Sequence, residues 1–268
     1  MKKNRIIPVL LLKNGWLVQS KGFIRHQNLG NPITAVKRMS EWASDELIYL
    51  DISKDNLYDT RRNDQGYQNK QSFLEIISDV SQVTFMPITV GGKIRTLDDI
   101  SERLSRGADK VSINTIAIEN QSFIEQAAKE FGSQCIVISM DAKMQNKNHI
   151  IFKNGGSTPT QYSAEIFAKI VEEHGAGEIL INSIDKDGMR NGYDIDLLNK
   201  VSTNVSIPVI GLGGVGEWSH LKEAFTKTKI DAVAAANIFH YTDQSVYLAK
   251  KYLFDSGYNV RRPDLLNI

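Results

Sequence analysis

The sequence contains one cysteine, no long apolar run and almost no excess charge of either sign. A single cysteine, Cys135, excludes a disulfide framework or a cysteine-based zinc site and is typical of a reducing compartment. No apolar stretch approaches the roughly 20 residues that span a bilayer. The basic start Met1–Arg5 is followed by an apolar run too short for a signal peptide. We therefore expect a cytoplasmic protein that does not engage a membrane.

The charge balance excludes a further class of protein. The 268 residues carry 32 Lys and Arg against 31 Asp and Glu, a formal net charge of +1. Because nucleic-acid binding needs an excess of cations on one face, no nucleic-acid partner is expected. The five histidines are scattered without the spacing of metal ligands. No metal and no cofactor are predicted.

Eight short apolar runs alternate with helix-like stretches along the whole chain. The runs are continuous and rich in Val and Ile, as in parallel strands buried on both faces. They are Ile6–Leu12, Leu47–Ile52, Thr84–Val90, Lys110–Ile113, Cys135–Met140, Glu178–Ile184, Pro208–Leu212 and Asp231–Ala235. Amphipathic segments lie between them, among them Ile33–Ala43, Gln71–Val83, Leu97–Arg106, Ser122–Phe131 and Ala164–His174.

Eight βα units in one series predict a (β/α)8, or TIM, barrel, which usually has about 250 residues. A doubly wound open sheet is the competing fold, but it rarely uses eight units so evenly. No Pro-, Gly- or Ser-rich linker divides the sequence, so one α/β domain over residues 1–268 is expected.

The second half of the chain resembles the first. Pro87-Ile-Thr-Val-Gly-Gly-Lys-Ile matches Pro208-Val-Ile-Gly-Leu-Gly-Gly-Val, and each is followed by a helix and a short strand. The end of the first strand, Leu10-Leu-Leu-Lys13, matches the end of the fifth, Met140-Asp-Ala-Lys143. These pairings predict a barrel built of two similar half-barrels.

Active sites of such barrels lie at the carboxyl ends of the strands, where this chain has two Gly-Gly turns. Such turns free backbone N–H groups to contact an anion, although one alone is as often only a tight turn. Gly213-Gly214 with Ala236-Asn237 would form one phosphate site, and Gly92-Lys93 with Asn114-Thr115 its half-barrel equivalent. Two such sites imply a substrate with an anion at each end.

Asp141 ends the fifth strand, where a carboxylate serves as a general acid or base or, alternatively, as a helix N-cap. Its half-barrel equivalent is Leu11, so only one of two possible facing carboxylates is present. At the opposite end of the strands, two cations and two anions could form a ring of ion pairs. These are Arg5, Glu46, Lys110 and Glu178, and ordinary structural pairing is the alternative reading.

The sequence resembles the HisF family, the cyclase subunit of imidazole glycerol phosphate synthase, over nearly its whole length. The most specific stretches are Asp109-Lys-Val-Ser-Ile-Asn-Thr115, Phe131-Gly-Ser-Gln134, Gly175-Ala-Gly-Glu-Ile-Leu180, Ser183-Ile-Asp-Lys-Asp-Gly188 and Gly192-Tyr-Asp194. The resemblance implies a barrel that takes ammonia from a glutaminase docked on its lower face and passes it to a substrate at the top. Arg5, Glu46, Lys110 and Glu178 then match the family's charged gate.

The sequence also departs from the family pattern. Leu11 replaces the first of two catalytic aspartates, Gln19 a lysine of the strand-one loop, and Asn237 a serine. The start Arg5–Lys13 instead resembles a paralogous branch found with surface-polysaccharide genes. That branch is associated with a HisH-like glutaminase and a third, ATP-using protein, and converts an acetamido group on a sugar into an acetamidino group.

The leading hypothesis is therefore a HisF-like synthase subunit of a glutamine-dependent complex that acts on a phosphorylated small molecule or nucleotide sugar. Asp141 would be its acid–base residue, assisted by Asp51 and Ser183. One anionic end would be held by Gly92, Lys93, Asn114 and Thr115, the other by Gly188, Gly213, Gly214, Ala236 and Asn237. A genuine cyclase and a catalytically silent ammonia-channel scaffold are the alternatives. The role of the long polar loop Asn56–Lys70 stays open.

Overall fold

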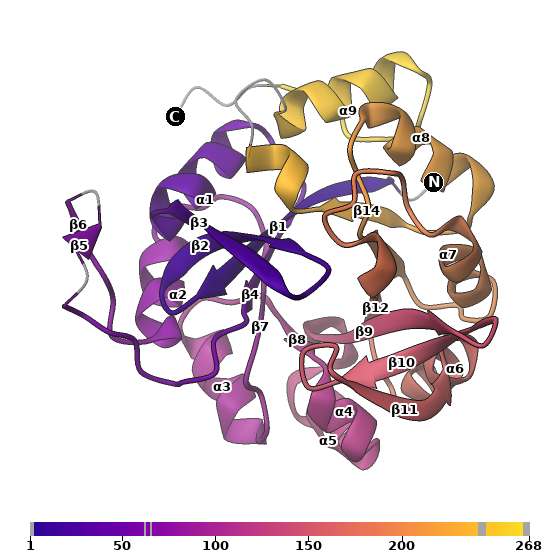
Figure 1. Cartoon of the computed structure of the whole chain (residues 1–268), viewed down its shortest axis with the longest axis horizontal. Helices are drawn as coiled ribbons and strands as arrows, with labels where there is room; N and C mark the ends of the chain where they lie inside the picture. Colours follow the sequence, from indigo (N-terminus) through magenta and orange to yellow (C-terminus); the bar gives the residue numbers. More distant parts are fainter. Residues whose placement is uncertain (1–2, 62, 65, 241–244, 265–268) are drawn as a thin grey trace.

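The computed structural model describes residues 3–61, 63–64, 66–240 and 245–264. Its centre is a closed barrel of eight parallel strands, which confirms the predicted TIM barrel (Figure 1). In barrel order they are β1 (Arg5–Lys13), β4 (Leu47–Asp51), β7 (Ile88–Gly91), β8 (Lys110–Ile113), β9 (Ile136–Gln145), β12 (Glu178–Ser183), β13 (Val209–Leu212) and β14 (Ala232–Ala235). The last strand closes the barrel, because Arg5 pairs with Ala232 and Pro8 with Ala235.

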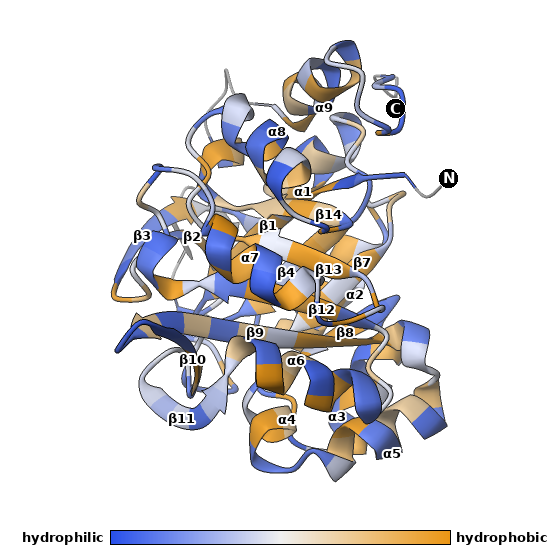
Figure 2. Ribbon diagram, turned by 90° about the vertical axis from the view of Figure 1, so that its right-hand side faces the viewer, coloured by the Kyte–Doolittle hydropathy of each residue, from blue (hydrophilic) through white to orange (hydrophobic). Residues whose placement is uncertain are grey.

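Helices on the outside of the barrel connect these strands. They are α1 (Pro32–Glu41), α2 (Phe73–Ser81), α3 (Leu97–Ser105), α4 (Thr115–Glu119), α5 (Ser122–Phe131), α6 (Ala164–Glu173), α7 (Ile195–Ser202), α8 (Trp218–Lys227) and α9 (Val246–Asp255), with short 3-10 turns η1 (Ser133–Cys135), η2 (Ile184–Lys186) and η3 (Asn237–His240). Figure 2 shows the apolar strands enclosed by helices that carry polar residues outward. None of the described helices combines the length and apolar composition that crossing a membrane requires.

The barrel interior is filled by a second, smaller apolar cluster, separate from the layer between strands and helices. Ile7 and Val9 lie on the same side of β1 as Arg5, because side chains in a strand alternate between its two faces. Their cluster comprises Ile7, Val9, Ile48, Val137, Leu180, Ile210, Leu212, Ala232 and Ala234, with Leu11, Leu50 and Ala236 packed against it. The barrel is therefore a packed core with polar groups at its two ends.

Aspartates at the lower end of the barrel fix the register of alternate strands. Each precedes one strand and accepts a hydrogen bond from the first backbone N–H groups of its neighbour. The three contacts are Ile6 N to Asp45 Oδ2 (2.9 Å), Ile88 N to Asp109 Oδ2 (2.8 Å) and Val209 N to Asp231 Oδ2 (3.0 Å). They hold the strand starts, and hence the charged residues there, in place.

Two β-hairpins rise from equivalent positions of the two half-barrels. After β1, the chain forms β2 (Trp16–Lys21) and β3 (Arg25–Gly30); after β9, it forms β10 (Asn148–Lys153) and β11 (Thr158–Ser163). Neither hairpin was expected from the apolar runs, and their occurrence after the first and fifth barrel strands extends the half-barrel repeat. A small third hairpin, β5 (Asn63–Asp64) with β6 (Tyr67–Gln68), lies in the loop after β4.

Two strand boundaries differ clearly from the prediction. The fifth run was expected to end at Met140, but β9 continues to Gln145 because it pairs there with β10. The run Thr84–Val90 was expected to be a strand throughout, but β7 begins only at Ile88. Pro87 has no N–H group to donate to a neighbouring strand. Phe85 is 74% exposed outside the barrel, so apolar character there does not reflect strand burial.

Candidate functional site

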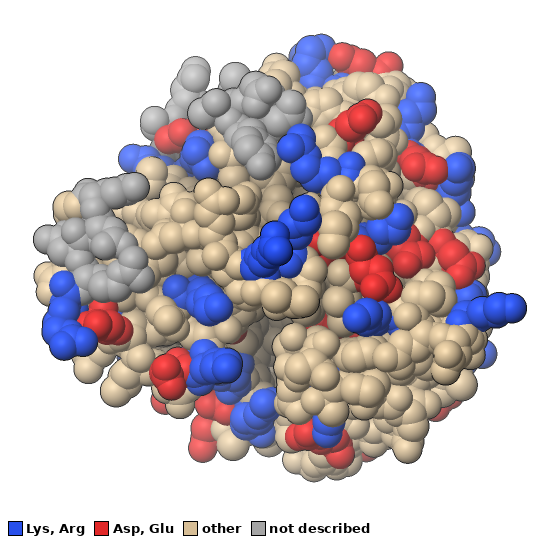
Figure 3. All heavy atoms as spheres, in the orientation of Figure 1, with Lys and Arg blue, Asp and Glu red and all other residues tan. Residues whose placement is uncertain are grey.

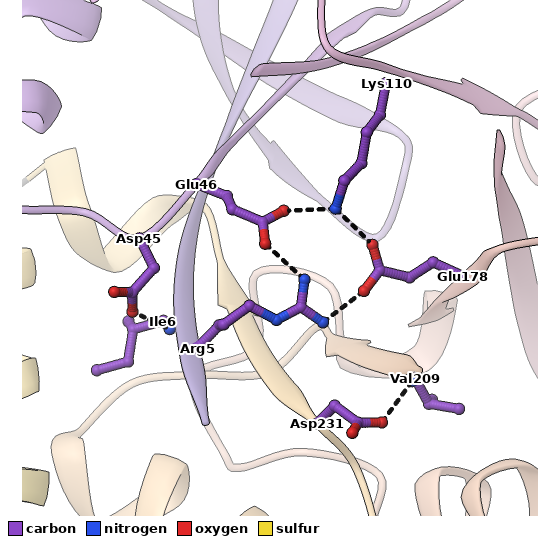
Figure 4. A network of polar contacts seen from close by, with 8 residues as sticks. All are labelled: Arg5, Ile6, Asp45, Glu46, Lys110, Glu178, Val209 and Asp231. Atoms are coloured by element: carbon purple, nitrogen blue, oxygen red, sulfur yellow. Dashed lines mark hydrogen bonds and ion pairs between the residues drawn. The ribbon is translucent and has the colours of Figure 1, made fainter. Parts of the chain in front are cut away.

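Four charged side chains form a closed ring across the lower end of the barrel (Figure 4). Arg5 donates to Glu46 Oε1 (2.6 Å) through one terminal nitrogen and to Glu178 through the other. Lys110 Nζ lies 3.0 Å from a carboxylate oxygen of each of the same two glutamates. The four predicted gate residues thus lie in one network, with each cation bridging both anions.

The ring is largely buried, and its ion pairs favour the charged forms of Arg5, Glu46 and Lys110. Burial alone would lower the pKa of Arg5, but Glu178 and Glu46 raise it above its ordinary value. Burial opposes ionisation of Glu46, yet Arg5 and Lys110 together lower its pKa. The pKa of Lys110 is raised by the two carboxylates against the effect of burial. Two basic and two acidic side chains, paired with one another, therefore close this end.

Asp141 lies at the opposite, carboxyl end of the barrel and is 8% exposed. Asn114 Nδ2 donates to Asp141 Oδ2 (2.9 Å) and to the Ser139 carbonyl (3.1 Å). Burial raises the pKa of Asp141 to about 7, against hydrogen bonds from Asn114 and Asn182 that lower it, and Asp187 adds a further rise. A carboxyl group that ionises near neutral pH both donates and accepts protons readily, which is what general acid–base chemistry needs.

The wall facing Asp141 is apolar. β1 lies four strands from β9 around the barrel, and its inward residue at this level is Leu11. Leu11 pairs with Leu50 on β4, and both pack against the inner cluster that contains Leu212. The upper end of the barrel therefore has a polar side at β8, β9 and β12 and an apolar side at β1, β4 and β13.

The Gly213-Gly214 turn after β13 and the Ala236-Asn237 turn after β14 lie side by side, as the predicted phosphate site requires. With Asp187, Gly188, Leu212 and Val215, they line a small cavity of about 20 Å³ that also includes Gly213, Gly214, Ala236 and Asn237. That volume holds about one water molecule. Backbone of the β2–β3 hairpin lies directly over it, since a Cβ at Gly188 would lie 2.5 Å from the Ser20 carbonyl oxygen.

Hydrogen bonds fix the hairpin in this position. Asn237 Nδ2 donates to the Ser20 carbonyl (2.7 Å), and the Ser20 N–H donates to Asn237 Oδ1 (3.3 Å). Asp187 Oδ2 accepts from the Ser20 hydroxyl (2.7 Å) and from the Phe23 N–H (3.0 Å). The Asn237 side chain, placed by sequence in an anion site, is thus occupied by the chain's own backbone.

A barrel with these two ends matches a known family. The sequence matches the histidine biosynthesis protein family over residues 5–245. The chain belongs to this family. Its members, the HisA- and HisF-like proteins, are TIM barrels and enzymes of histidine biosynthesis.

The other predicted site residues of this member of the histidine biosynthesis family make contacts of their own. Asp51 was expected to assist Asp141, but its described contacts run elsewhere. Its carboxylate accepts from Ser53 N (2.9 Å) and Tyr58 OH (2.8 Å) and pairs with Lys93 Nζ (3.0 Å). Burial and Asp51 raise the pKa of Tyr58 above its ordinary value. This cluster ties the loop after β4 to the Gly92-Lys93 turn.

The remaining predicted residues also separate. Thr115 Oγ1 accepts from the Asn154 N–H (3.2 Å), and the Ser183 hydroxyl donates to Asp194 (3.3 Å). Gly92, with φ +113°, is packed against Asp51, since a Cβ there would lie 2.3 Å from the Asp51 carbonyl oxygen. Of the residues proposed for the first anionic end, Lys93 pairs with Asp51, whereas Asn114 bonds to Asp141. The Thr115 hydroxyl lies between Asn114 Oδ1 (3.4 Å), to which it donates, and the turn after β10.

Sequence reasoning missed Asn182, which is 8% exposed beside Asp141. Its Oδ1 has no hydrogen-bond partner within the described part of the chain. Side chains alternate between the two faces of β12, so the inward direction of Glu178 and Leu180 could have predicted that Asn182 also points inward. Asp187 and Ser20 were missed because their role depends on a hairpin that the apolar runs do not reveal. Among the described residues, no three His, Cys, Asp or Glu side chains gather in a way that could hold a metal ion.

Proposed function

We propose that this chain is a HisF-like synthase subunit that receives ammonia from a HisH-like glutaminase and passes it through the barrel to a substrate at the upper end. The reaction we propose forms an acetamidino group on a surface-polysaccharide sugar. The observation that carries the proposal is the closed ring of Arg5, Glu46, Lys110 and Glu178. A ring of four alternating charges at one end of the barrel would control what enters there, whereas a purely structural ion pair needs only two partners.

The interior beyond the ring suits neutral ammonia better than ammonium, because burying an unpaired charge among apolar side chains is costly. Ser112 and Ser139, on β8 and β9, lie on the inward-facing register between Lys110 and the pair Asn114–Asp141. The Ser112 hydroxyl has no partner within the described residues and can exchange hydrogen bonds with ammonia in transit. The polar side of the barrel thus offers groups that can hydrogen-bond to ammonia on its way, and buried Thr89 of β7, in register with Lys110, adds one near the ring.

The upper end of the barrel suits a substrate that has one polar and one apolar face and that accepts the ammonia nitrogen. Asp141, with its pKa near 7, would take the proton that ammonia loses as its nitrogen attacks a carbonyl carbon. An acetamido group would place its methyl against Leu11, Leu50 and Leu212. Replacing the amide oxygen by nitrogen requires that oxygen to be activated, and the third, ATP-using partner protein would supply the activation.

Isotope labelling tests the proposal. The chain is combined with the glutaminase, the ATP-using protein and an N-acetylated nucleotide sugar, and supplied with amide-15N glutamine and an excess of unlabelled ammonium. A 15N-enriched acetamidino product is expected, and Arg5→Ala should lower the enrichment, whereas Arg106→Ala, at the exposed residue that follows α3, should not. Absence of a complex with the glutaminase in size analysis, together with intact coupling in Arg5→Ala, would contradict the gate.

A genuine imidazole glycerol phosphate synthase cyclase is the second candidate, favoured by the family match and by the retained Asp141. Rapid turnover of the histidine-pathway intermediate with ammonium by the unmodified chain would establish that function in place of the first. The third candidate, a scaffold that only conducts ammonia, requires that glutaminase stimulation persist and that Asp141→Asn leave product formation unchanged.

A further inference from the structure

The inner face of the β2–β3 hairpin carries two basic side chains beside the mouth of the barrel. Lys13 follows Leu11 by two residues on β1, so its side chain starts on the inward side. His26 lies opposite Ser20 in the hairpin, and Ser20 points toward the barrel, where its hydroxyl reaches Asp187. Paired residues of a hairpin share a face, so His26 lies on that inner face too.

These two side chains contact each other, and neither has a carboxylate partner in the described part of the chain. Lys13 Nζ lies 3.3 Å from His26 Nδ1. Neither forms an ion pair with a described carboxylate, and the nearest acid acting on His26, Asp187, already accepts bonds from Ser20 and Phe23. A lysine whose single polar contact among the described residues is an imidazole nitrogen retains two N–H donors. The pair can therefore receive an anion.

The usual place for such an anion is filled. The turns at Gly188, Gly213 and Gly214 enclose room for about one water molecule, and Ser20 and Asn237 hold the hairpin over them. An anionic group approaching the mouth meets the hairpin before it meets these glycines. In Figure 3, basic side chains gather at the centre of the face where Figure 1 places the hairpin.

We propose that Lys13 and His26 form a phosphoryl-binding site at the barrel mouth, which takes over from the covered glycine turns. The inference rests on the proposed function only in taking this phosphoryl group to be part of the substrate. Lys13 supplies a fixed charge, and His26 becomes a second cation when it gains a proton on binding. The proton comes from solvent, so binding and protonation are linked.

The charges around His26 give the sign of this linkage. Burial lowers the pKa of His26, Lys13 lowers it further, and Asp187 opposes them. A phosphate dianion beside both groups would offset the repulsion from Lys13 and raise the pKa of His26. Phosphate affinity should accordingly decrease as pH rises through the pKa of His26 in the bound state.

NMR of the five histidine rings tests the site on the isolated chain, with inorganic phosphate as the probe. The His26 signal, assigned by its loss in His26→Gln, should shift with phosphate, and its pKa should rise. Lys13→Gln should weaken the apparent phosphate affinity by about tenfold or more. Lys21→Gln is the matched control, because Lys21 is exposed near the tip of the same hairpin and has the same charge.

Other outcomes are distinguishable. Unchanged signals of the other four histidines show that each variant is folded. A His26 signal that does not respond to phosphate, or equal weakening by Lys13→Gln and Lys21→Gln, would overturn the site. Because no glutaminase is present, that failure leaves ammonia transfer untouched. Conversely, phosphate binding at His26 without any 15N transfer would refute the proposed function alone.

Discussion

Leu11 and Asp141 occupy equivalent positions in the two halves of the barrel. Leu11 pairs with Val18 of the adjacent hairpin and with Leu50 of the next barrel strand. Asp141 pairs in the same way with Phe152 and with Asn182. One half of the site thus carries a carboxylate and an amide where the other half carries two leucines.

This equivalence predicts the effect of restoring a carboxylate. Suppose that Leu11 alone separates this chain from the second candidate function, the cyclase. Leu11→Asp should then raise turnover of the histidine-pathway intermediate with ammonium by at least about 10²-fold, the contribution typical of a positioned acid–base group. Leu11→Asn is the matched control, since it has the same size as the aspartate and cannot ionise. The measurement is steady-state turnover of both variants. Equal rates for the two variants would show that residue 11 does not separate the functions.

The raised pKa of Asp141 predicts how stability depends on pH. The folded pKa of about 7 exceeds the ordinary value of 3.8, so between these values the native state holds more protons than the unfolded state. Stability therefore falls as pH rises through this window and then levels off. Asp141→Asn removes the ionisation and should be more stable than the unmodified chain at pH 8 by on the order of 2–4 kcal/mol, with little difference near pH 4. Urea unfolding at both pH values measures this, and a pH-independent difference would contradict the buried carboxyl.

Much of the fold could be predicted because the barrel strands are buried on both faces and so are continuously apolar. The hairpins could not be found that way, since β3 reads Arg-His-Gln-Asn-Leu-Gly and is largely exposed. A clue did exist for β10, because Asn146 and Lys147 between β9 and β10 both have positive φ, as in a type I′ turn. An asparagine at such a position, flanked by strand residues, is a usable indicator.

The candidate site was predictable only where a residue's position along a strand determines the direction of its side chain. Arg5, Glu46, Lys110 and Glu178 lie at or next to the strand starts, and alternation points them into one plane. Asp51 and Lys93 could not be separated from Asp141 in the same way. Their contacts depend on Tyr58, in a long loop whose path no periodicity predicts.

The two hydrogen bonds between the Asn237 side chain and Ser20 predict how accessible the β2–β3 hairpin is to a protease. Asn237→Ala removes two hydrogen bonds to Ser20, each contributing about 1 kcal/mol, so the hairpin should open about thirtyfold more often. Trypsin cleavage after Lys21 and Arg25 measures the opening. Asn204→Ala is the control, because Asn204 bonds only within its own surface segment. Cleavage that is no faster in Asn237→Ala would show that Asp187 alone holds the hairpin.

The ring at the lower end predicts strong coupling between Arg5 and Glu178. Arg5→Ala leaves two largely buried carboxylates with only Lys110 between them and should cost on the order of 3 kcal/mol at pH 7. Adding Glu178→Gln removes one of the stranded charges, so the double variant should be less destabilised than the sum of the single variants by about 1–3 kcal/mol. Arg5 and Lys110 lower the pKa of Glu46 in the unmodified chain. The stability lost in Arg5→Ala, relative to the unmodified chain, should therefore become smaller as pH falls toward the range in which an unpaired carboxylate is protonated. Urea unfolding of the four proteins gives this cycle, and additive losses would mean that the four charges act as separate surface pairs with no joint role at the barrel entrance.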